Sequence, residues 1–183
     1  MSALAALAQG EAPRYSDQDM ACFVVYAGAA MFGLPVEAVH AIFRIQSITP
    51  VPLGPPVVLG LVNLRGKIVT AISLERRLDL PPRAAPIAGQ AYGVAIDAAG
   101  ESYALIVDGV GDAMTCREAE RTAPPSHVCE TRARLTQAYY RIENGILPVL
   151  DIDALFDLGS RRARAEGHSE IRPRRDTTNG ADT

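Results

Sequence analysis

Tryptophan is absent from the chain, and aromatic residues make up only 5% of its 183 positions. The hydrophobic fraction of 48% therefore rests mostly on Val, Leu, Ile and Ala, and it is large enough to bury a sizeable core. The net charge of −3 gives no reason to expect attraction to nucleic acid or to an anionic membrane surface. We expect one domain of ordinary size, or two small ones that share a core.

Cysteine and long hydrophobic runs are also scarce. The chain has three cysteines, an odd number without CxxC spacing, which indicates free thiols in a reducing compartment and argues against a disulfide framework or a zinc site. No stretch approaches the roughly 18 uninterrupted apolar residues of a membrane-spanning helix, and the N-terminus lacks the basic start and apolar run of a signal peptide. We expect a cytoplasmic protein without direct membrane insertion.

The two ends differ in composition from the middle. Residues 1–19 are rich in Ala and small polar residues and predict a flexible arm. Residues 159–183 contain six arginines, four acidic residues and one strongly apolar residue, Ile171, so they predict a disordered basic tail. A solvated end is the simpler interpretation of this tail, and binding to an acidic partner is the alternative.

Between these ends, short β-rich runs alternate with turn signals, a pattern typical of small β-barrels. Pro35 predicts the start of a helix over 35–43, and Ser73 and Asp151 are expected to cap two short helices. Residues 117–137 are polar and predict a loop with a helical turn. The expected strands cover residues 22–27, 59–64, 68–72, 91–96, 102–107, 110–115, 138–142 and 146–150.

An internal echo suggests that the fold is a repeat. Residues 36–39 (VEAV) resemble 107–110 (VDGV), and residues 70–74 (TAISL) resemble 148–152 (PVLDI). The spacing indicates two copies of roughly 75 residues. We therefore predict two barrels side by side with a binding groove at their junction, one formed roughly by residues 20–80 with the C-terminal segment and the other by 90–158.

For each candidate pattern of catalytic residues, a structural explanation is the better one. The three histidines are scattered, and Ser126-His127 lies near Cys129 in a polar loop without a GxSxG elbow. The segment GVGDAM lacks the third glycine of a dinucleotide fingerprint. Asp151 and Asp153 are explained by the helix that they begin. We predict no enzymatic activity, no cofactor and no metal site.

One residue needs a different explanation. Arg65 stands at the Arg65-Gly66-Lys67 turn of an otherwise apolar hairpin, where Asn-Gly or Asp-Gly is the ordinary choice, as in Asn144-Gly145. Arg65 is either a solubilising charge or a fixed guanidinium that recognises a partner, since its planar fork of donors suits carboxylate and backbone groups at an interface.

These segments together resemble the CheW family of chemotaxis coupling proteins over residues 20–158. The runs are VEAVHAIFRIQSITPVP, VVLGLVNLRGKIVTAISLERRL, ALIVDGVGDAM and ILPVLDIDALF. The resemblance implies a mainly β fold, with two five-stranded SH3-like barrels packed around a shared core and short helices. Its most specific positions are Gly60, Asn63, Leu64, Arg65 and Gly66 in one segment and Val107, Asp108 and Val110 in the other.

The resemblance also implies a non-catalytic adaptor. Family members couple chemoreceptors to a CheA-type histidine kinase: they bind the receptor's cytoplasmic signalling tip between the barrels, and they bind the kinase's CheW-like regulatory domain. Such a protein is cytoplasmic and is recruited to membrane-associated receptor arrays. By position, the implied partner-binding residues are Gly60, Asn63, Arg65, Gly66, Val39, Ala41, Val107 and Val110.

Two departures from the family pattern leave alternatives open. Ala41 stands where the family usually has a glutamate, which affects partner choice. Ser73 replaces the usual aspartate but keeps the capping chemistry. The chain is therefore also consistent with a paralogue in an accessory pathway such as twitching motility, or with a ligand-sensing small β-barrel protein that shares only the fold.

Overall fold

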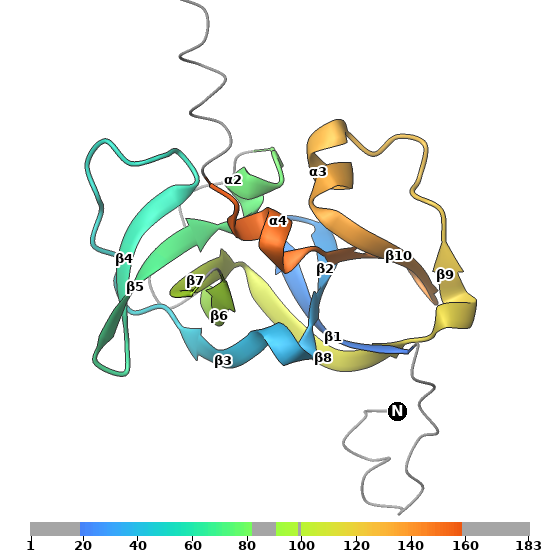
Figure 1. The fold of residues 1–183 in the computed structure, drawn as a ribbon, viewed down its shortest axis with the longest axis horizontal. Helices are drawn as coiled ribbons and strands as arrows, with labels where there is room; N and C mark the ends of the chain where they lie inside the picture. Colours follow the sequence, from blue (N-terminus) through green and yellow to red (C-terminus); the bar gives the residue numbers. More distant parts are fainter. Residues whose placement is uncertain (1–18, 82–90, 99, 159–183) are drawn as a thin grey trace, which may run out of the picture.

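The computed structural model describes residues 19–81, 91–98 and 100–158. The predicted terminal arm and tail (1–18 and 159–183) and most of the linker between the repeats (82–90) lie outside the described residues. The described chain forms two strongly curved β-sheets that lie side by side, with a few short helices between and above them (Figure 1). The prediction of a mainly β fold with two SH3-like barrels is confirmed.

The first barrel is a five-stranded sheet made from the middle of the chain. Its order is β3-β6-β7-β5-β4, in which β5 and β7 are parallel and the other neighbours are antiparallel. Paired backbone hydrogen bonds between Thr49 and Leu61, both 2.8 Å, join the segment after β3 to β4 and close the sheet. The strands are β3 (Val39–Arg44), β4 (Val58–Leu64), β5 (Lys67–Ser73), β6 (Tyr92–Ala98) and β7 (Glu101–Val107).

The second barrel takes its strands from both ends of the described chain. Its order is β8-β1-β2-β11-β10-β9, with β2 and β11 parallel. It has six strands where five were expected, because the two-residue strand β9 extends its edge. The strands are β1 (Met20–Ala27), β2 (Ala30–Pro35), β8 (Gly109–Cys116), β9 (Arg121–Thr122), β10 (Thr136–Ile142) and β11 (Gly145–Leu150).

The two barrels have the same internal order. Replacing β3, β6, β7, β5 and β4 by β8, β1, β2, β11 and β10 converts one sheet into the other, including its one parallel pair. The predicted repeat is therefore real at the level of topology. The VEAV and VDGV segments of the sequence occupy equivalent places, since each leads from one barrel into the first strand of the other.

The predicted division of the chain between the barrels is wrong. Hairpin β1–β2 lies in the sheet of β8–β11, and hairpin β6–β7 lies in the sheet of β3–β5, so each repeat gives its first hairpin to the other barrel. The reason is that each barrel needs a parallel neighbour for its last long strand, β5 or β11, and a short direct connection cannot supply a parallel neighbour. Local sequence patterns do not reveal this exchange.

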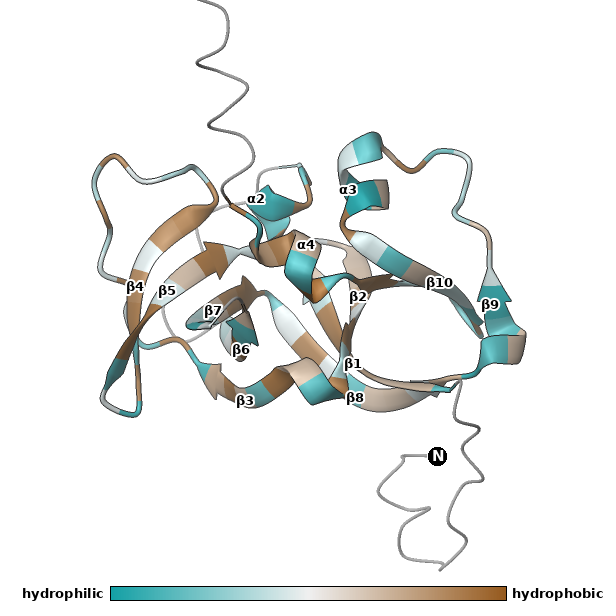
Figure 2. Ribbon diagram, viewed as in Figure 1, coloured by the Kyte–Doolittle hydropathy of each residue, from teal (hydrophilic) through white to brown (hydrophobic). Residues whose placement is uncertain are grey.

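The described chain has three layers of hydrophobic core, and hydrophobic segments, brown in Figure 2, recur along the strands of both sheets. One layer fills each barrel, and the largest lies between the barrels. Because side chains alternate across a strand, β6 contributes Val94 and Ile96 to the central layer, and β1 contributes Val25 from the opposite side. The shared core expected from the family resemblance is this central layer.

The helices are short. The helix expected over 35–43 is a single turn, η1 (Val36–Ala38), after which the chain continues as β3 because the outward and inward faces of Val39–Arg44 alternate and pair with β6. No helix in the described segments is long and apolar enough to cross a membrane. The others are α2 (Leu74–Arg77), η2 (Glu118–Glu120), α3 (Glu130–Arg134) and α4 (Ile152–Phe156).

Both predicted helix caps are confirmed. The Ser73 hydroxyl accepts a hydrogen bond from the Arg76 amide at 3.2 Å, and the Asp151 carboxylate accepts one from the Ala154 amide at 2.9 Å. Arg77 of α2 then donates to main-chain carbonyls of α4, including that of Leu155 at 2.7 Å. A cation that binds the free carbonyls at a helix end stabilises that end, and here it also ties the first repeat to the second.

The exchanged hairpins predict how the protein behaves when it is cut. Fragment 1–85 lacks two strands of the first barrel and four of the second, and fragment 86–183 lacks three of the first and two of the second, so neither can complete a barrel alone. We expect each fragment to be unfolded by circular dichroism and by hydrogen exchange, and the mixture to give one folded 1:1 complex with a single melting transition. Cooperative melting of fragment 86–183 by itself would contradict the exchanged topology.

The three cysteines are free thiols in very different surroundings. Cys22 and Cys116 are buried in the core of the second barrel, and contact with the Cys116 thiol together with burial raises the pKa of Cys22. Cys129 is only half-buried, and a hydrogen bond from Arg132 Nε to its Sγ, 3.1 Å long, lowers its pKa.

This contrast predicts selective alkylation. In the native protein we expect iodoacetamide to modify Cys129 alone, because only its thiol is both accessible and biased toward the thiolate. The rate should reach half its maximum below the ordinary thiol pKa of about 8.5, and Arg132→Gln should move that midpoint upward. Mass spectrometry across a pH series measures this, and equal labelling of Cys22 or Cys116 in the folded state would refute it.

Candidate partner-binding surface

The β4–β5 hairpin ends in a two-residue turn. Leu64 pairs with Lys67, and the central residues Arg65 and Gly66 have φ values of 52° and 89°. Positive φ at both positions is the type I′ geometry, in which Asn, Asp and Gly are the favoured residues. A left-handed conformation costs an arginine about 1–2 kcal/mol, so Arg65 is kept at a position that its own backbone disfavours.

Asn63 holds this turn from within. Its side-chain oxygen Oδ1 accepts a hydrogen bond of 2.6 Å from the Gly66 amide. A Cβ atom at Gly66 would meet no neighbouring atom, so a lack of space does not explain why glycine stands here. The positive φ of this position explains it. Of the predicted partner-binding residues at the hairpin, Asn63 and Gly66 therefore shape the turn that presents Arg65.

The two cations of the hairpin differ in their interactions. Lys67 Nζ donates to Ser102 Oγ at 2.7 Å, Ser102 Oγ donates to Asp97 Oδ1 at 2.6 Å, and His40 Nε2 lies 3.3 Å from Asp97 Oδ2. This polar row crosses strands β5, β7, β6 and β3 of the first barrel. The side chain of Arg65 is exposed and makes no hydrogen bond or ion pair with the residues that the structure describes.

An exposed isoleucine follows the turn of this hairpin. Ile68 pairs with Asn63 across the hairpin and keeps 60% of its surface exposed. It was not predicted as a binding residue. Strand alternation places it on the face of Ile72, which is fully buried, so the two ends of this face differ in exposure. Asn63, Arg65 and Ile68 together form what we call the hairpin surface.

Gly60 has a structural role. It lies in β4 at a register shift, has φ of 147°, and is buried. A Cβ atom there would collide with the Thr49 carbonyl, the group whose hydrogen bonds close the first barrel. The structure therefore explains Gly60 by close backbone approach and gives it no exposed contact surface.

The remaining predicted residues lie at the crossovers between barrels. Val107 is 3% exposed and belongs to the central core, while Val39 and Val110 are half-buried and pack against it. Ala41 is half-buried on β3, opposite Ala95. Of these four predicted residues, Val107 is enclosed, whereas Val39, Val110 and Ala41 retain exposed surface.

Asp108, between the two valines of the second crossover, braces the neighbouring hairpin. Its carboxylate accepts a hydrogen bond of 2.6 Å from the Gly28 amide, and its own amide donates to the Tyr26 carbonyl at 2.9 Å. Tyr26 keeps 37% of its surface exposed beside this crossover. The specific VDGV motif of the sequence thus fixes the position of β1–β2 relative to the first barrel.

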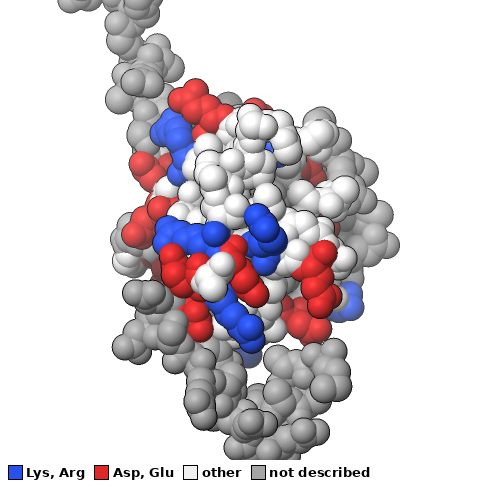
Figure 3. Space-filling view, turned by 90° about the vertical axis from the view of Figure 1, so that its right-hand side faces the viewer, with Lys and Arg blue, Asp and Glu red and all other residues white. Residues whose placement is uncertain are grey.

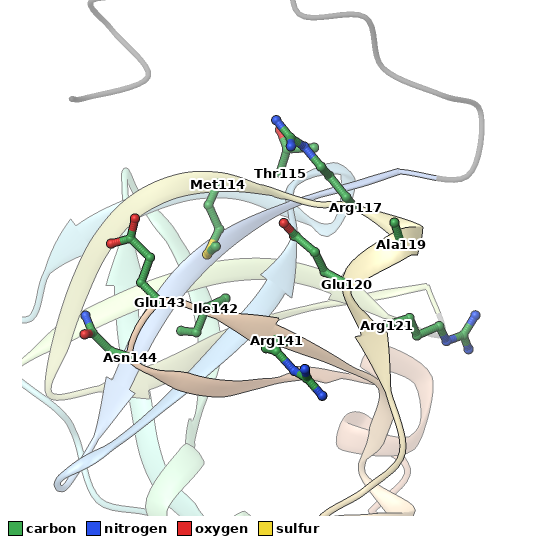
Figure 4. Close-up of a pocket in the computed structure, with 10 residues that line it drawn as sticks. All are labelled: Met114, Thr115, Arg117, Ala119, Glu120, Arg121, Arg141, Ile142, Glu143 and Asn144. Carbon is green, nitrogen blue, oxygen red and sulfur yellow. The ribbon is translucent and has the colours of Figure 1, made fainter.

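The open end of the second barrel carries a wide cavity of about 850 Å³. Its three arginines point in different directions, and acidic and basic side chains alternate over this face (Figures 3 and 4). The groups do not converge on one point, and no cluster of three potential metal-ligating side chains occurs among the described residues. The lining residues are Met114, Thr115, Arg117, Ala119, Glu120, Arg121, Arg141, Ile142, Glu143 and Asn144.

Similarities to known proteins agree with this geometry. The chain is 24% identical to the chemotaxis protein CheW of Treponema pallidum over 143 residues, which cover 77% of this chain and 84% of the relative. It is 28% identical to the chemotaxis protein CheW of Bacillus subtilis over 132 residues, which cover 72% of this chain and 83% of the relative.

The fold is also found among solved structures. The scaffolding protein TtCheW from Thermoanaerobacter tengcongensis superposes with a TM-score of 0.66 at 24% sequence identity, covering 76% of this chain and 94% of TtCheW. The family model of the CheW-like domain matches residues 21–160, which include both barrels and both crossovers. The chain therefore belongs to the CheW-like domain family.

Proposed function

We propose that this protein is a non-catalytic adaptor that couples chemoreceptors to a CheA-type histidine kinase. The observation that carries the proposal is Arg65: its conformation is strained, its side chain is exposed, and no described residue engages its guanidinium. Residues with a strained backbone conformation are common at binding sites, where the side chain serves a partner and not the packing of the fold. Family membership supports a scaffold role in chemosensory signalling.

The chemistry of the hairpin surface suits a protein interface. Arg65 offers a planar fork of donors to a carboxylate or a main-chain carbonyl, and Ile68, three residues further along the same hairpin, offers an exposed apolar side chain. Interfaces combine such apolar contacts with a few oriented polar groups. We assign this surface to the kinase's regulatory domain, which is itself expected to be CheW-like.

The junction of the barrels suits a helix. Val39, Val110 and Tyr26 give it partly exposed apolar surface, and a helical receptor tip can place its own apolar stripe there. Ala41 presents no charge where the family usually has glutamate, so we expect the cognate receptor to lack a matching cation. A receptor without that cation would fit a paralogue that serves an accessory pathway. The adaptor would act in the cytoplasm, at receptor arrays.

The proposal is tested by calorimetric titration with two purified partners, the cognate kinase's regulatory domain and a helical-hairpin receptor tip. We expect each to bind in a 1:1 ratio. An adaptor requires both contacts, so failure to bind either partner would refute the proposal. A small molecule that raises the melting temperature in the absence of either partner would favour the ligand-sensing alternative.

Arg65→Asn separates binding from stability. Asparagine accepts the left-handed conformation, so the melting temperature should stay unchanged or rise, by about 2–4 °C for each kcal/mol of strain released. Affinity for the kinase's regulatory domain should fall by at least tenfold, because the guanidinium is lost. Arg65→Lys is the matched control: it keeps the charge without the fork and should recover only part of the affinity. A fall in melting temperature with unchanged affinity would mean that Arg65 is structural.

Gly60→Ala should behave in the opposite way. The new Cβ collides with the Thr49 carbonyl and the backbone is strained for any other residue, so we expect a loss of about 3 kcal/mol in unfolding free energy. Denaturant titration measures the loss. Well below the unfolding transition, the folded fraction should still bind the kinase domain normally. Unchanged stability together with lost binding would instead make Gly60 a contact residue.

A further inference from the structure

The loop between β3 and β4 projects from the first barrel on the side away from the second barrel, next to β4 in Figure 1. All residues from Thr49 to Pro56 are exposed. Leu53 at its tip has a relative exposure of 102%, and Val51 has 42%. A large apolar side chain at full exposure gains no stability from burial.

The backbone at Leu53 is also unfavourable. Its φ is 60°, and it follows Pro52 in a turn, at the place where Gly or Asn is the ordinary residue. A bulky residue with positive φ is a genuine outlier. Leu53 therefore combines two penalties, strain and exposure, that a glycine or an asparagine would remove without any loss of packing.

The base of the loop is fixed. Thr49 is held by its paired hydrogen bonds to Leu61, the Pro56 carbonyl accepts from Arg76 Nη1 at 2.8 Å, and the Val57 carbonyl accepts from the Ser73 amide at 2.9 Å. Four prolines stand between residues 50 and 56 and restrict the chain further. A loop whose ends are fixed in this way loses less backbone entropy when a partner binds.

The chemistry of the loop points to an uncharged partner pocket. Residues 45–64 contain no Asp, Glu, Lys or Arg. Pro52 and Pro55 have PxxP spacing, but the positive φ of Leu53 is incompatible with a polyproline II helix, so an aromatic groove for PxxP segments does not fit. A membrane surface does not fit either, because the loop lacks the basic residues and the broad apolar face of an interfacial anchor.

We propose that Leu53 is an anchor residue that inserts into an uncharged apolar pocket on the kinase's regulatory domain. This inference rests on the proposed function. It gives the kinase domain a second contact with this protein, in addition to the hairpin surface. The loop lies on the outer side of the first barrel, whereas a receptor helix at the junction would lie between the barrels. Of the two proposed partners, only the kinase domain is therefore free to reach it.

The test uses the full chain and two substitutions. Leu53→Asn removes the apolar side chain and suits the positive φ, so the melting temperature should stay unchanged or rise by about 2–4 °C. Its affinity for the kinase's regulatory domain should fall at least tenfold, which corresponds to about 1.4 kcal/mol. Leu53→Met keeps an apolar side chain of similar volume and should bind within threefold of the unchanged protein.

Three results would overturn the anchor. One is an affinity of Leu53→Asn within fivefold of the unchanged protein; another is a lower melting temperature, which would mean that Leu53 packs within the fold. The third is a loss of affinity for the receptor tip instead of the kinase domain. If the unchanged chain binds neither partner, the proposed function fails and the anchor with it. If it binds the kinase domain and Leu53→Asn binds equally well, only the anchor fails.

Discussion

The exchange of hairpins between the two repeats is the constraint on which the rest of the structure depends. Because β5 needs β7, and β11 needs β2, as its parallel neighbour, each barrel is completed only by the other repeat. The two crossovers that result carry Val39, Val107 and Val110 into one central core. Arg77 adds a polar tie between the repeats through the α4 carbonyls. The barrels therefore form one unit of fixed geometry.

Such a unit tolerates local strain at its surface. The first barrel is closed by the Thr49–Leu61 hydrogen bonds, which Gly60 makes possible, and the turn of its hairpin is held by Asn63. The two strained residues lie close to these supports in the chain: Arg65 comes shortly after Asn63, and Leu53 shortly after Thr49. A backbone that is over-determined elsewhere can hold disfavoured conformations, and here both of them present a side chain without a described partner.

The sequence predicted the local elements well and the long-range arrangement poorly. Short apolar runs bounded by turn residues marked most strands, and Ser73 and Asp151 marked two helix starts, since these signals act within a few residues. The assignment of hairpins to barrels was wrong because pairing partners lie far apart in the chain.

The candidate site was predicted in the same uneven way. Arg65 was identified because it breaks the rule for its turn, whereas Gly60 and Val107 matched the family motif for reasons of packing. Ile68 was missed, since it belongs to the same apolar run as the buried Ile72 and only the structure shows that it is exposed. A family motif thus identifies important residues, but it does not distinguish residues that contact a partner from residues that stabilise the fold.

Under the proposed function, one rigid chain presents separate surfaces to two partners. Analytical ultracentrifugation of the chain with both the kinase's regulatory domain and the receptor tip tests this most directly. Because the hairpin surface and the barrel junction lie on different elements, we expect a ternary 1:1:1 complex that sediments faster than either binary complex. Displacement of one partner by the other, with binary complexes alone, would contradict the account.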